Sequence, residues 1–196
     1  KIRYVGSTEK KYRDNLKENG VGVRAILGSK LRRYFSWANF VDIPKFAISF
    51  WQALFYLLLF MPDVVFSKGG PGSIPVVLVA RFYRIPVVIH ESDSVPSVTG
   101  SFTSKFAKII ATSFESAEPY FRGKKGRVIF TGNPIRGSLL KENISQSKAK
   151  AFLEFDIDSP LILILGGSQG AEFINDFILD NLPDILKLTQ IFHQTG

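Results

Sequence analysis

The chain has 196 residues, of which 45% are hydrophobic and 21% are charged, with a formal net charge of +8 and no cysteine. This balance excludes a disordered chain, and the lack of cysteine excludes disulfide bonds and thiolate metal sites. The positive charge suits nucleic acid, anionic lipid or phosphorylated substrates as partners, and charge alone does not choose among them.

The first ten residues, KIRYVGSTEK, contain no apolar run of the signal-peptide kind. They already resemble a strand, and no initiator methionine precedes them. We therefore expect this sequence to be part of a longer protein whose start lies upstream of Lys1.

Short apolar runs alternate along the chain with segments long enough for a crossover helix. Continuous apolar runs are typical of strands covered on both faces, and their alternation with helices predicts a parallel sheet with helices on both sides. The expected fold class is α/β, with a Rossmann-like doubly wound parallel sheet. We predict strands at residues 3–7, 21–26, 63–67, 86–90, 108–113, 127–131, 161–165 and 191–193.

The polar segment 133–160 interrupts this alternation. We predict a first domain over residues 1–132, a connection over residues 133–160 and the beginning of a second Rossmann-like domain over residues 161–196. The last part holds only a strand, a helix and a strand, which is too little for an independent sheet.

The segment FAISFWQALFYLLLFMP, residues 46–62, predicts an apolar helix with Ser49 and Gln52 as its only polar side chains. It is slightly shorter than the roughly 20 apolar residues of a membrane-spanning helix. Basic and aromatic residues precede it, a combination typical of helices at an anionic bilayer surface. We favour a helix that packs on the sheet and keeps an apolar outer side; a fully buried core helix and a true span are the alternatives. The candidate membrane residues are Arg32, Arg33, Phe50, Trp51 and Phe55.

A glycine-rich turn, SKGGPGSIP, follows the third predicted strand and precedes a helix expected at residues 76–83. Gly69 and Gly70 can adopt backbone angles closed to other residues and let a ligand approach the backbone, and Lys68 adds a cation. A simple turn without a ligand is the alternative.

The next strand, in PVVIHESDS, brings His90, Glu91 and Asp93 to its carboxyl end, the edge at which open parallel sheets bind ligands. His90 is a candidate base or phosphate partner, and Glu91 or Asp93 can orient sugar hydroxyls. A helix cap with a satisfied loop histidine is the structural alternative. In FTGNPIR, Arg136 follows a sharp bend, and its planar fork suits a diphosphate.

The segment LILILGGSQGAEFIN, residues 161–175, leads from a strand through Gly166 and Gly167 to Ser168 and Gln169, which we place at the start of a helix. Free N–H groups and the positive end of a helix dipole favour a phosphate there, and Ser168 can cap the helix. A capped turn without a ligand is the alternative.

The only histidines, His90 and His193, are far apart in the sequence, so we expect neither a metal nor a cofactor. There is no Walker motif and no complete GxGxxG motif. Aromatic residues are not interleaved with basic ones as on RNA-binding strands, so we expect no nucleic acid partner.

Five motifs, DVVFSKGG, IPVVIHE, TGNPIR, LGGSQGA and HQTG, occur in the order and spacing of the MurG-type glycosyltransferases. The chain resembles this family over essentially its whole length. The resemblance implies a GT-B architecture with an acceptor-binding domain at the cytoplasmic face of the bacterial membrane and a second domain that binds UDP-N-acetylglucosamine. It also implies inverting transfer of N-acetylglucosamine to undecaprenyl-pyrophosphoryl-muramyl-pentapeptide, with no metal.

The resemblance also implies site residues. The donor would meet Asp93, Arg136, Gly167, Ser168 and Gln169, and the acceptor would meet Gly69, Gly70, His90 and Glu91. The family commonly reads HEQN where this chain reads HESD. The family's first strand and glycine-rich turn, with a proposed catalytic histidine, would precede Lys1, and the remaining donor contacts would follow Gly196. We therefore expect this 196-residue piece alone to be inactive.

Two alternatives stay open at this point. One is another enzyme of the same architecture, such as a UDP-sugar epimerase or a glycolipid-forming glycosyltransferase. The other is a non-catalytic module that binds lipid or nucleotide.

Overall fold

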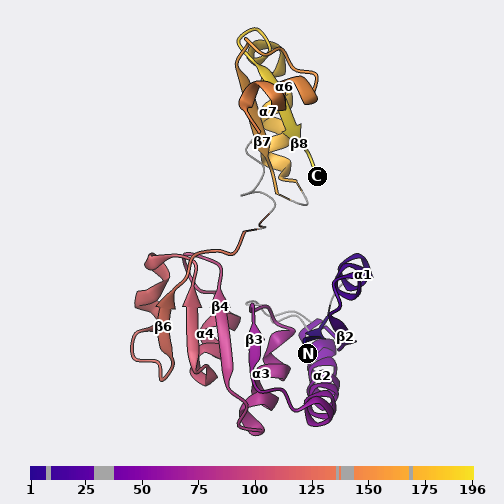
Figure 1. Ribbon diagram of the computed structural model, residues 1–196, viewed down its shortest axis with the longest axis vertical. Helices are drawn as coiled ribbons and strands as arrows, with labels where there is room; N and C mark the ends of the chain where they lie inside the picture. The colour runs from indigo at the N-terminus through magenta and orange to yellow at the C-terminus, as the bar shows by residue number, and fades with distance from the viewer. Residues whose placement is uncertain (8–9, 29–37, 136, 138–143, 168–169) are drawn as a thin grey trace. The chain divides into compact units, whose positions relative to one another are not determined.

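The computed structural model describes residues 1–7, 10–28, 38–135, 137, 144–167 and 170–196. The chain divides into two compact units, Lys1–Pro134 and Ile135–Gly196, and each is described by itself (Figure 1). All eight predicted strands are present, and each begins and ends within two residues of the expected bounds.

The first unit alternates strands and helices, as the sequence predicts. Its elements in chain order are β1 (Arg3–Gly6), α1 (Lys10–Glu18), β2 (Gly22–Ala25), α2 (Ala38–Phe60), β3 (Val65–Ser67), α3 (Ser73–Phe82), β4 (Val87–Glu91), α4 (Val98–Thr103), η1 (Ser104–Phe106), β5 (Ile109–Thr112), η2 (Glu115–Phe121) and β6 (Arg127–Phe130).

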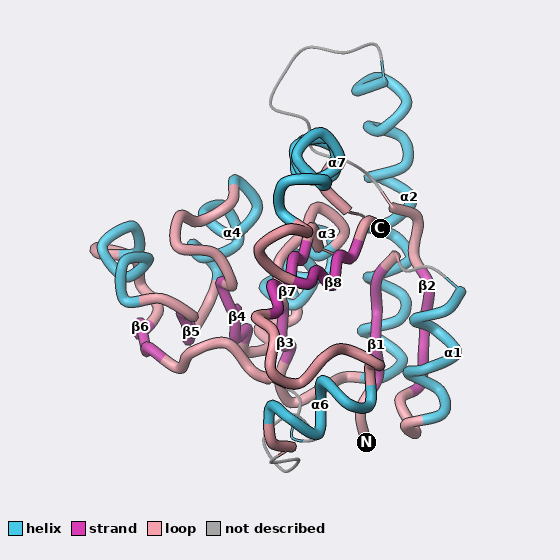
Figure 2. The backbone as a smooth tube through the Cα atoms, turned by 90° about the horizontal axis from the view of Figure 1, so that it is seen from above, coloured by secondary structure: helices cyan, strands magenta, loops and turns pink. Residues whose placement is uncertain are grey.

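All strand pairs of the first unit are parallel, which confirms the prediction of a parallel α/β fold. The described strands of this unit belong to two sheets. They form a two-stranded sheet, β1-β2, and a four-stranded sheet, β3-β4-β5-β6. Figure 2 shows β6, β5, β4 and β3 side by side in this order, with α4 and α3 on one side of them.

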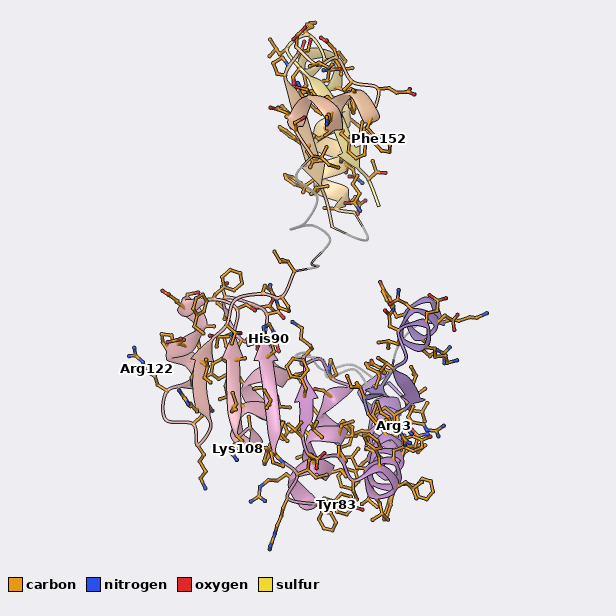
Figure 3. All side chains as sticks on the ribbon, viewed as in Figure 1. Arg3, Tyr83, His90, Lys108, Arg122 and Phe152 are labelled. Carbon is orange, nitrogen blue, oxygen red and sulfur yellow. The ribbon has the colours of Figure 1, made fainter. Side chains whose placement is uncertain are left out.

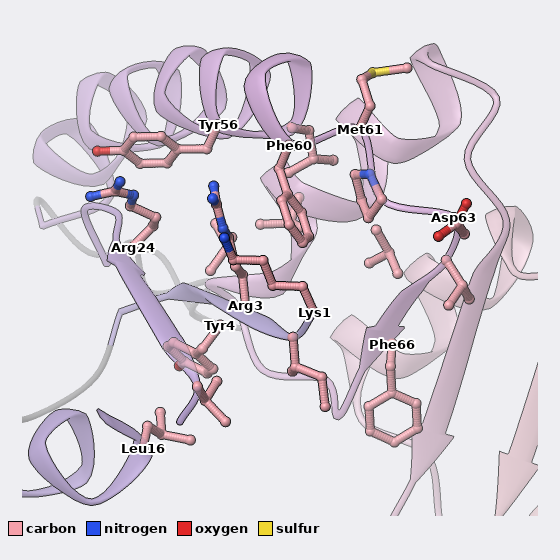
Figure 4. A pocket seen from close by; sticks show the side chains of 18 residues that line it. Lys1, Arg3, Tyr4, Leu16, Arg24, Tyr56, Phe60, Met61, Asp63 and Phe66 are labelled. Carbon is pink, nitrogen blue, oxygen red and sulfur yellow. The ribbon is translucent and has the colours of Figure 1, made fainter. Parts of the chain in front are cut away.

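A cavity of about 710 Å³ is lined by residues of both β1 and β3, which do not pair. Its walls come from β1, from the last turn of α2 and from residues 62–66 (Figure 4). The Arg3 guanidinium lies 4.3 Å from the centroid of the Phe60 ring at this cavity. Hydrogen-bonded strands lie about 4.7–4.9 Å apart. Side chains of β1 and β3 line this cavity, and the two strands belong to different sheets.

The main core lies between α3 and the four-stranded sheet. Helix α3, SIPVVLVARF, buries nearly all of its first two turns, and its valines pack against Val87, Ile89 and Ile110 of the sheet. The helix ends at Phe82, and Arg84 then turns the chain with a φ of +60° into β4. On the opposite face of the sheet Phe66 is 61% exposed, so that face is more open.

The buried face of α2 carries Ser49, Ala53 and Leu57, which are spaced four residues apart and therefore lie on one side of the helix. The Ser49 hydroxyl donates to the carbonyls of Lys45 and Leu27, and the Leu27 N–H donates to Gln52 Oε1 at 3.0 Å. Ser49 and Gln52 of α2 thus hold the segment that follows β2.

The second unit contains α6 (Gln146–Phe152), β7 (Leu161–Leu165), α7 (Glu172–Ile185) and β8 (Gln190–Gln194), with β7 and β8 in parallel. Helix α6 lies in the segment that the sequence assigned to a connection. Its Lys150 is buried and donates to the carbonyls of Ile157 and Ser159 at 2.9 and 2.6 Å. These bonds tie α6 to the loop before β7.

Candidate functional site

Polar residues gather where the strands of the four-stranded sheet end. Lys68 follows β3, Ser92 follows β4, Ser113 follows β5 and Gly132 lies two residues after β6. The strands are parallel and in register, so all four positions belong to one edge. Figure 3 shows His90 at this end of β4. This carboxyl edge is where open α/β sheets bind ligands.

His90 connects three of these strand ends. Its Nδ1 lies 2.8 Å from Lys68 Nζ, and its Nε2 lies 3.2 Å from the Gly132 carbonyl oxygen. The Ser113 hydroxyl lies 3.4 Å from Nε2. Lys68 Nζ also donates to Ser92 Oγ at 2.6 Å. The side chain of His90 is only 6% exposed, so it sits beneath Lys68.

The partners of His90 determine its tautomer. A carbonyl oxygen only accepts and an ammonium group only donates, so Nε2 carries the proton and Nδ1 accepts from Lys68. Both ring nitrogens are therefore engaged within the fold. In this arrangement His90 has no free lone pair with which to act as the base considered from the sequence.

Gly69 and Gly70 form the turn that follows Lys68, with φ angles of +87° and +84°. These values favour glycine over every other residue. A Cβ added at either position would meet nothing within 4 Å, so the space beside the turn is open. The Gly69 N–H donates to Ser67 Oγ at 3.2 Å, which fixes the start of the turn.

Glu91 lies on the other face of β4, toward α4. Its carboxylate is 7% exposed, accepts from the Asp93 N–H at 3.3 Å and would lie 2.1 Å from a Cβ added at Gly100. Asp93 itself is exposed. Glu91 thus supports the loop that carries Asp93. The ligand contacts that we expect for Glu91 and Asp93 stay predictions.

Several predicted site residues lie outside the described part of the chain: Arg32, Arg33, Arg136, Ser168 and Gln169. Gly167 is described and has a φ of +84°, with open space around it. Helix α7 begins at Glu172 with Ala171 as its N-cap. Gly170, which directly precedes this N-cap, has a φ of +73°. The capping role that we expected for Ser168 lies outside the described residues.

The outer face of α2 forms an apolar stripe, defined by Ile48, Trp51, Phe55 and Leu58, which are 47%, 67%, 56% and 51% exposed. The spacing of three and four residues places these side chains on one side of the helix. This finding excludes the fully buried core helix. Phe50, which we expected among the membrane residues, is partly buried and packs against the core. Its expected contact with a membrane stays a prediction.

Residues 43–60 of α2 are long and apolar enough to cross a membrane, and within the described ranges no other helix is. Within those ranges there is also no group of three or more histidine, aspartate or glutamate side chains that could hold a metal ion.

Sequence reasoning noted Lys68 only as an added cation and did not place it among the site residues. It also missed Ser92 and Ser113. The signal for Lys68 was its position between a strand end and paired glycines. The two serines carry no pattern of their own, because only the register of β4 and β5 brings them to His90.

A parallel α/β unit with a polar, glycine-bearing carboxyl edge, followed in the chain by a second α/β unit in which β7, α7 and β8 succeed one another, is the arrangement of the GT-B fold. The N-terminal domain of glycosyltransferase family 28 matches residues 1–112. The chain belongs to glycosyltransferase family 28.

Relatives and solved structures agree with this family. The chain is 38% identical over 195 residues to a UDP-N-acetylglucosamine–N-acetylmuramyl-(pentapeptide) pyrophosphoryl-undecaprenol N-acetylglucosamine transferase of Bacillus cereus, covering 100% of this chain and 54% of that protein. It is 41% identical over 172 residues to the transferase of the same name from Treponema denticola, covering 87% of this chain and 44% of that protein. The chain thus spans about half the length of the curated relatives it matches.

The fold is shared with two kinds of solved structure. The crystal structure of Acinetobacter baumannii MurG aligns with a TM-score of 0.61 at 24% identity, covering 100% of this chain and 50% of that one. A UDP-GlcNAc 2-epimerase from Neisseria meningitidis bound to UDP-GlcNAc aligns with a TM-score of 0.64 at 18% identity, covering 100% of this chain and 57% of that one.

Proposed function

We propose that this chain supplies the acceptor-binding domain, and the start of the donor-binding domain, of an inverting N-acetylglucosaminyltransferase. The donor is UDP-N-acetylglucosamine and the acceptor is undecaprenyl-pyrophosphoryl-N-acetylmuramyl-pentapeptide. The observation that carries this proposal is the 38% identity over 195 residues to a transferase named for that reaction. The polar edge at Lys68 and His90 supports it, because this edge suits a phosphorylated ligand.

In the proposed reaction the muramyl 4-hydroxyl attacks C1 of the donor sugar. The bond from C1 to the new oxygen forms, the bond from C1 to the diphosphate oxygen breaks, and UDP leaves with the electron pair. The hydroxyl proton passes to a base that we do not assign among these 196 residues. Arg136 would stabilise the growing charge on the diphosphate, which is electrostatic catalysis.

We also propose that the protein binds peripherally at the cytoplasmic face of the bacterial membrane. The apolar stripe of α2 supports this, since a row of exposed Ile, Trp, Phe and Leu side chains suits the boundary between headgroups and acyl chains. The basic residues Arg32 and Arg33 precede α2 in the sequence and would meet anionic headgroups.

A UDP-sugar epimerase is the second candidate, because the fold is shared with UDP-GlcNAc 2-epimerases. The two reactions give different products from the same donor.

The full-length product of this gene is incubated with UDP-N-acetylglucosamine, with and without the lipid acceptor, and both sugar products are followed by NMR. The transferase proposal predicts UDP release only when the acceptor is present. Formation of a C2 epimer without the acceptor would refute it.

A further inference from the structure

Six basic side chains gather around the amino ends of β5 and β6. They belong to two loops, residues 104–108, which lead into β5, and residues 122–127, which run into β6. Figure 3 shows Lys108 at the opposite end of the sheet from His90, and Arg122 beside β6. Five of the six side chains are exposed and one is half-buried. We call this set the cationic cluster: Lys105, Lys108, Arg122, Lys124, Lys125 and Arg127.

Backbone contacts hold the two loops of the cationic cluster together. The Arg127 N–H donates to the Lys108 carbonyl at 3.0 Å. A Cβ added at Gly126 would lie 2.6 Å from the Ala107 oxygen, so the two loops touch without room for a side chain between them. Gly123 turns the second loop with a φ of +77°. Because these contacts fix the backbone beneath the charges, a partner that binds here has less of the loop left to order.

The charges of the cationic cluster are not neutralised within the fold. Neither loop contains an aspartate or a glutamate. The acids of the segment between the loops, Glu115 and Glu118, lie in η2. Among the described residues none of the six basic side chains takes part in an ion pair, and the Lys105 ammonium group lies 5.9 Å from the centroid of the Phe102 ring. Like charges gathered on one surface produce a positive potential that attracts an anionic partner.

The composition of the two loops indicates the kind of anion. All of their exposed side chains are lysine or arginine, and their one aromatic residue, Phe106, packs against the core. A surface that enters a bilayer adds apolar side chains, and a surface that binds single-stranded nucleic acid adds exposed aromatic rings for base stacking. A surface of lysine and arginine alone is complementary to carboxylates presented by another protein.

The cationic cluster also lies away from the face that we propose for the membrane. The last turn of α2 lines a cavity beside β3, and β6 is at the other end of the sheet order β3-β4-β5-β6. Figures 1 and 2 both show β6 and α2 at opposite ends of the first unit. Across the sheet, β6 is about 14 Å from β3, which is more than the Debye length of about 8 Å at physiological salt. Headgroups that meet α2 are therefore largely screened from the cluster.

We propose that the cationic cluster is a docking surface for an acidic segment of another protein, with several aspartate or glutamate side chains close together in its sequence. The segment would lie across both loops and pair its carboxylates with the lysine and arginine side chains. None of the six residues belongs to the proposed substrate sites, so this inference does not depend on sugar transfer.

The test measures binding of a fluorescently labelled octaglutamate peptide to the full-length product of this gene by fluorescence anisotropy. Binding should be saturable and should weaken as the sodium chloride concentration rises, because salt screens exposed charges. Lys125→Glu with Arg127→Glu should weaken binding by about fivefold or more, since two attractions become repulsions. Lys125→Gln with Arg127→Gln should give a smaller loss, and circular dichroism should show both double variants folded.

The matched control is Lys10→Glu with Lys17→Glu. It changes the net charge equally, but at exposed positions of α1, which lies at the other end of the first unit from β6 (Figure 1). Its affinity for octaglutamate should stay within about twofold of that of the unchanged protein, because distant exposed charges are screened. The proposal is wrong if octaglutamate does not bind, or if charge reversal in the cluster weakens binding no more than this control does.

Two further probes separate an acidic protein segment from other anions. Phosphatidylglycerol vesicles and double-stranded DNA are offered to the charge-reversed cluster variant and to the α1 control. The proposal predicts that the two variants bind vesicles equally well and bind DNA equally well. If the cluster variant loses more affinity for vesicles or for DNA than for octaglutamate, relative to the control, the cluster serves a membrane or a nucleic acid and the proposal is overturned.

Discussion

Lys68 Nζ lies 2.8 Å from His90 Nδ1, and the other ring nitrogen of His90 faces the Gly132 carbonyl at 3.2 Å. These two contacts join the ends of β3, β4 and β6 through one imidazole. The edge that carries the glycine turn is therefore built around a neutral, buried histidine.

The first prediction concerns the proton of this histidine. His90 should be in the Nε2–H tautomer, because Nδ1 must accept from an ammonium group. Nitrogen-detected NMR of the labelled imidazole distinguishes the two tautomers directly. Lys68→Ala should leave Nδ1 free to bind water and shift its resonance, while Lys108→Ala should not. A dominant Nδ1–H tautomer would contradict the hydrogen-bond network described for the edge.

The second prediction concerns the apolar stripe of α2. Trp51→Ser with Phe55→Ser should reduce binding to vesicles that contain phosphatidylglycerol by about tenfold or more, since burying each aromatic side chain is worth about 1.5–3 kcal/mol. Vesicle flotation gives the bound fraction, and a blue shift of Trp fluorescence reports insertion of the unchanged chain.

Phe173→Ser provides the control for this experiment, because Phe173 is 84% exposed but lies in α7 of the second unit. It should float with the vesicles as the unchanged chain does. If the double variant floats equally well, the stripe does not contact the membrane.

A third prediction tests how the chain enters β6. A Cβ added at Gly126 would lie 2.6 Å from the backbone oxygen of Ala107, which cannot move aside without disturbing the pairing of Arg127 with Lys108. Gly126→Ala should therefore destabilise the first unit by about 1–3 kcal/mol. Urea unfolding followed by far-ultraviolet circular dichroism measures this. In the control Gly22→Ala, the new Cβ meets Arg3 Cγ at 3.4 Å, an ordinary contact, and unfolding should occur at nearly the original urea concentration.

The fourth prediction is a pH dependence in the second unit. The pKa of Asp156 lies below its ordinary value of 3.8, first because the Ser159 hydroxyl donates to its carboxylate and then because the Asp158 N–H does. Because the pKa of Asp156 is lower in the folded state, its carboxylate stabilises the fold at pH values above the pKa of the unfolded chain. This stabilisation is lost as the pH falls through the pKa of the folded state.

Acidification should therefore loosen the 156–159 turn only at pH values below about 4. An NMR titration of the Asp156 carboxyl carbon should give a midpoint below 3.8, and Ser159→Ala should raise that midpoint. A midpoint that does not respond to Ser159→Ala would show that the hydroxyl is not the main cause.

The strands were predictable because each is a short apolar run between polar or glycine-rich segments, as LILIL before two glycines illustrates. The pairing of the strands was not predictable. Nothing in the sequences of β1 and β3 indicates whether these two strands share hydrogen bonds or face a cavity.

The candidate site, like the sheet, was predictable from the sequence only in part. Gly69 and Gly70 were predictable, because a glycine pair after a strand indicates a turn with positive φ. The fixed position of Lys68 depends on His90, which is 22 residues away in the sequence. Contacts of this kind arise from strand register, which a single sequence does not display.

Composition alone does not predict which apolar residues of α2 are exposed. Counting apolar side chains in residues 46–62 predicts an apolar helix but assigns Phe50 and Trp51 to the same surface. Consecutive residues point about 100° apart around a helix, so Phe50 packs on the core while Trp51 is exposed.

The most direct test of the account is the formation of a lipid-linked disaccharide by the full-length product of this gene. With radiolabelled UDP-N-acetylglucosamine and the undecaprenyl-pyrophosphoryl acceptor, label should enter the lipid fraction only when both substrates are present. Arg136→Ala should lower kcat/KM for the donor by about 10–100-fold with the fold intact, since a charge-assisted hydrogen bond is worth about 1.5–3 kcal/mol. No label in the lipid fraction, or unchanged donor kinetics in Arg136→Ala, would contradict the account.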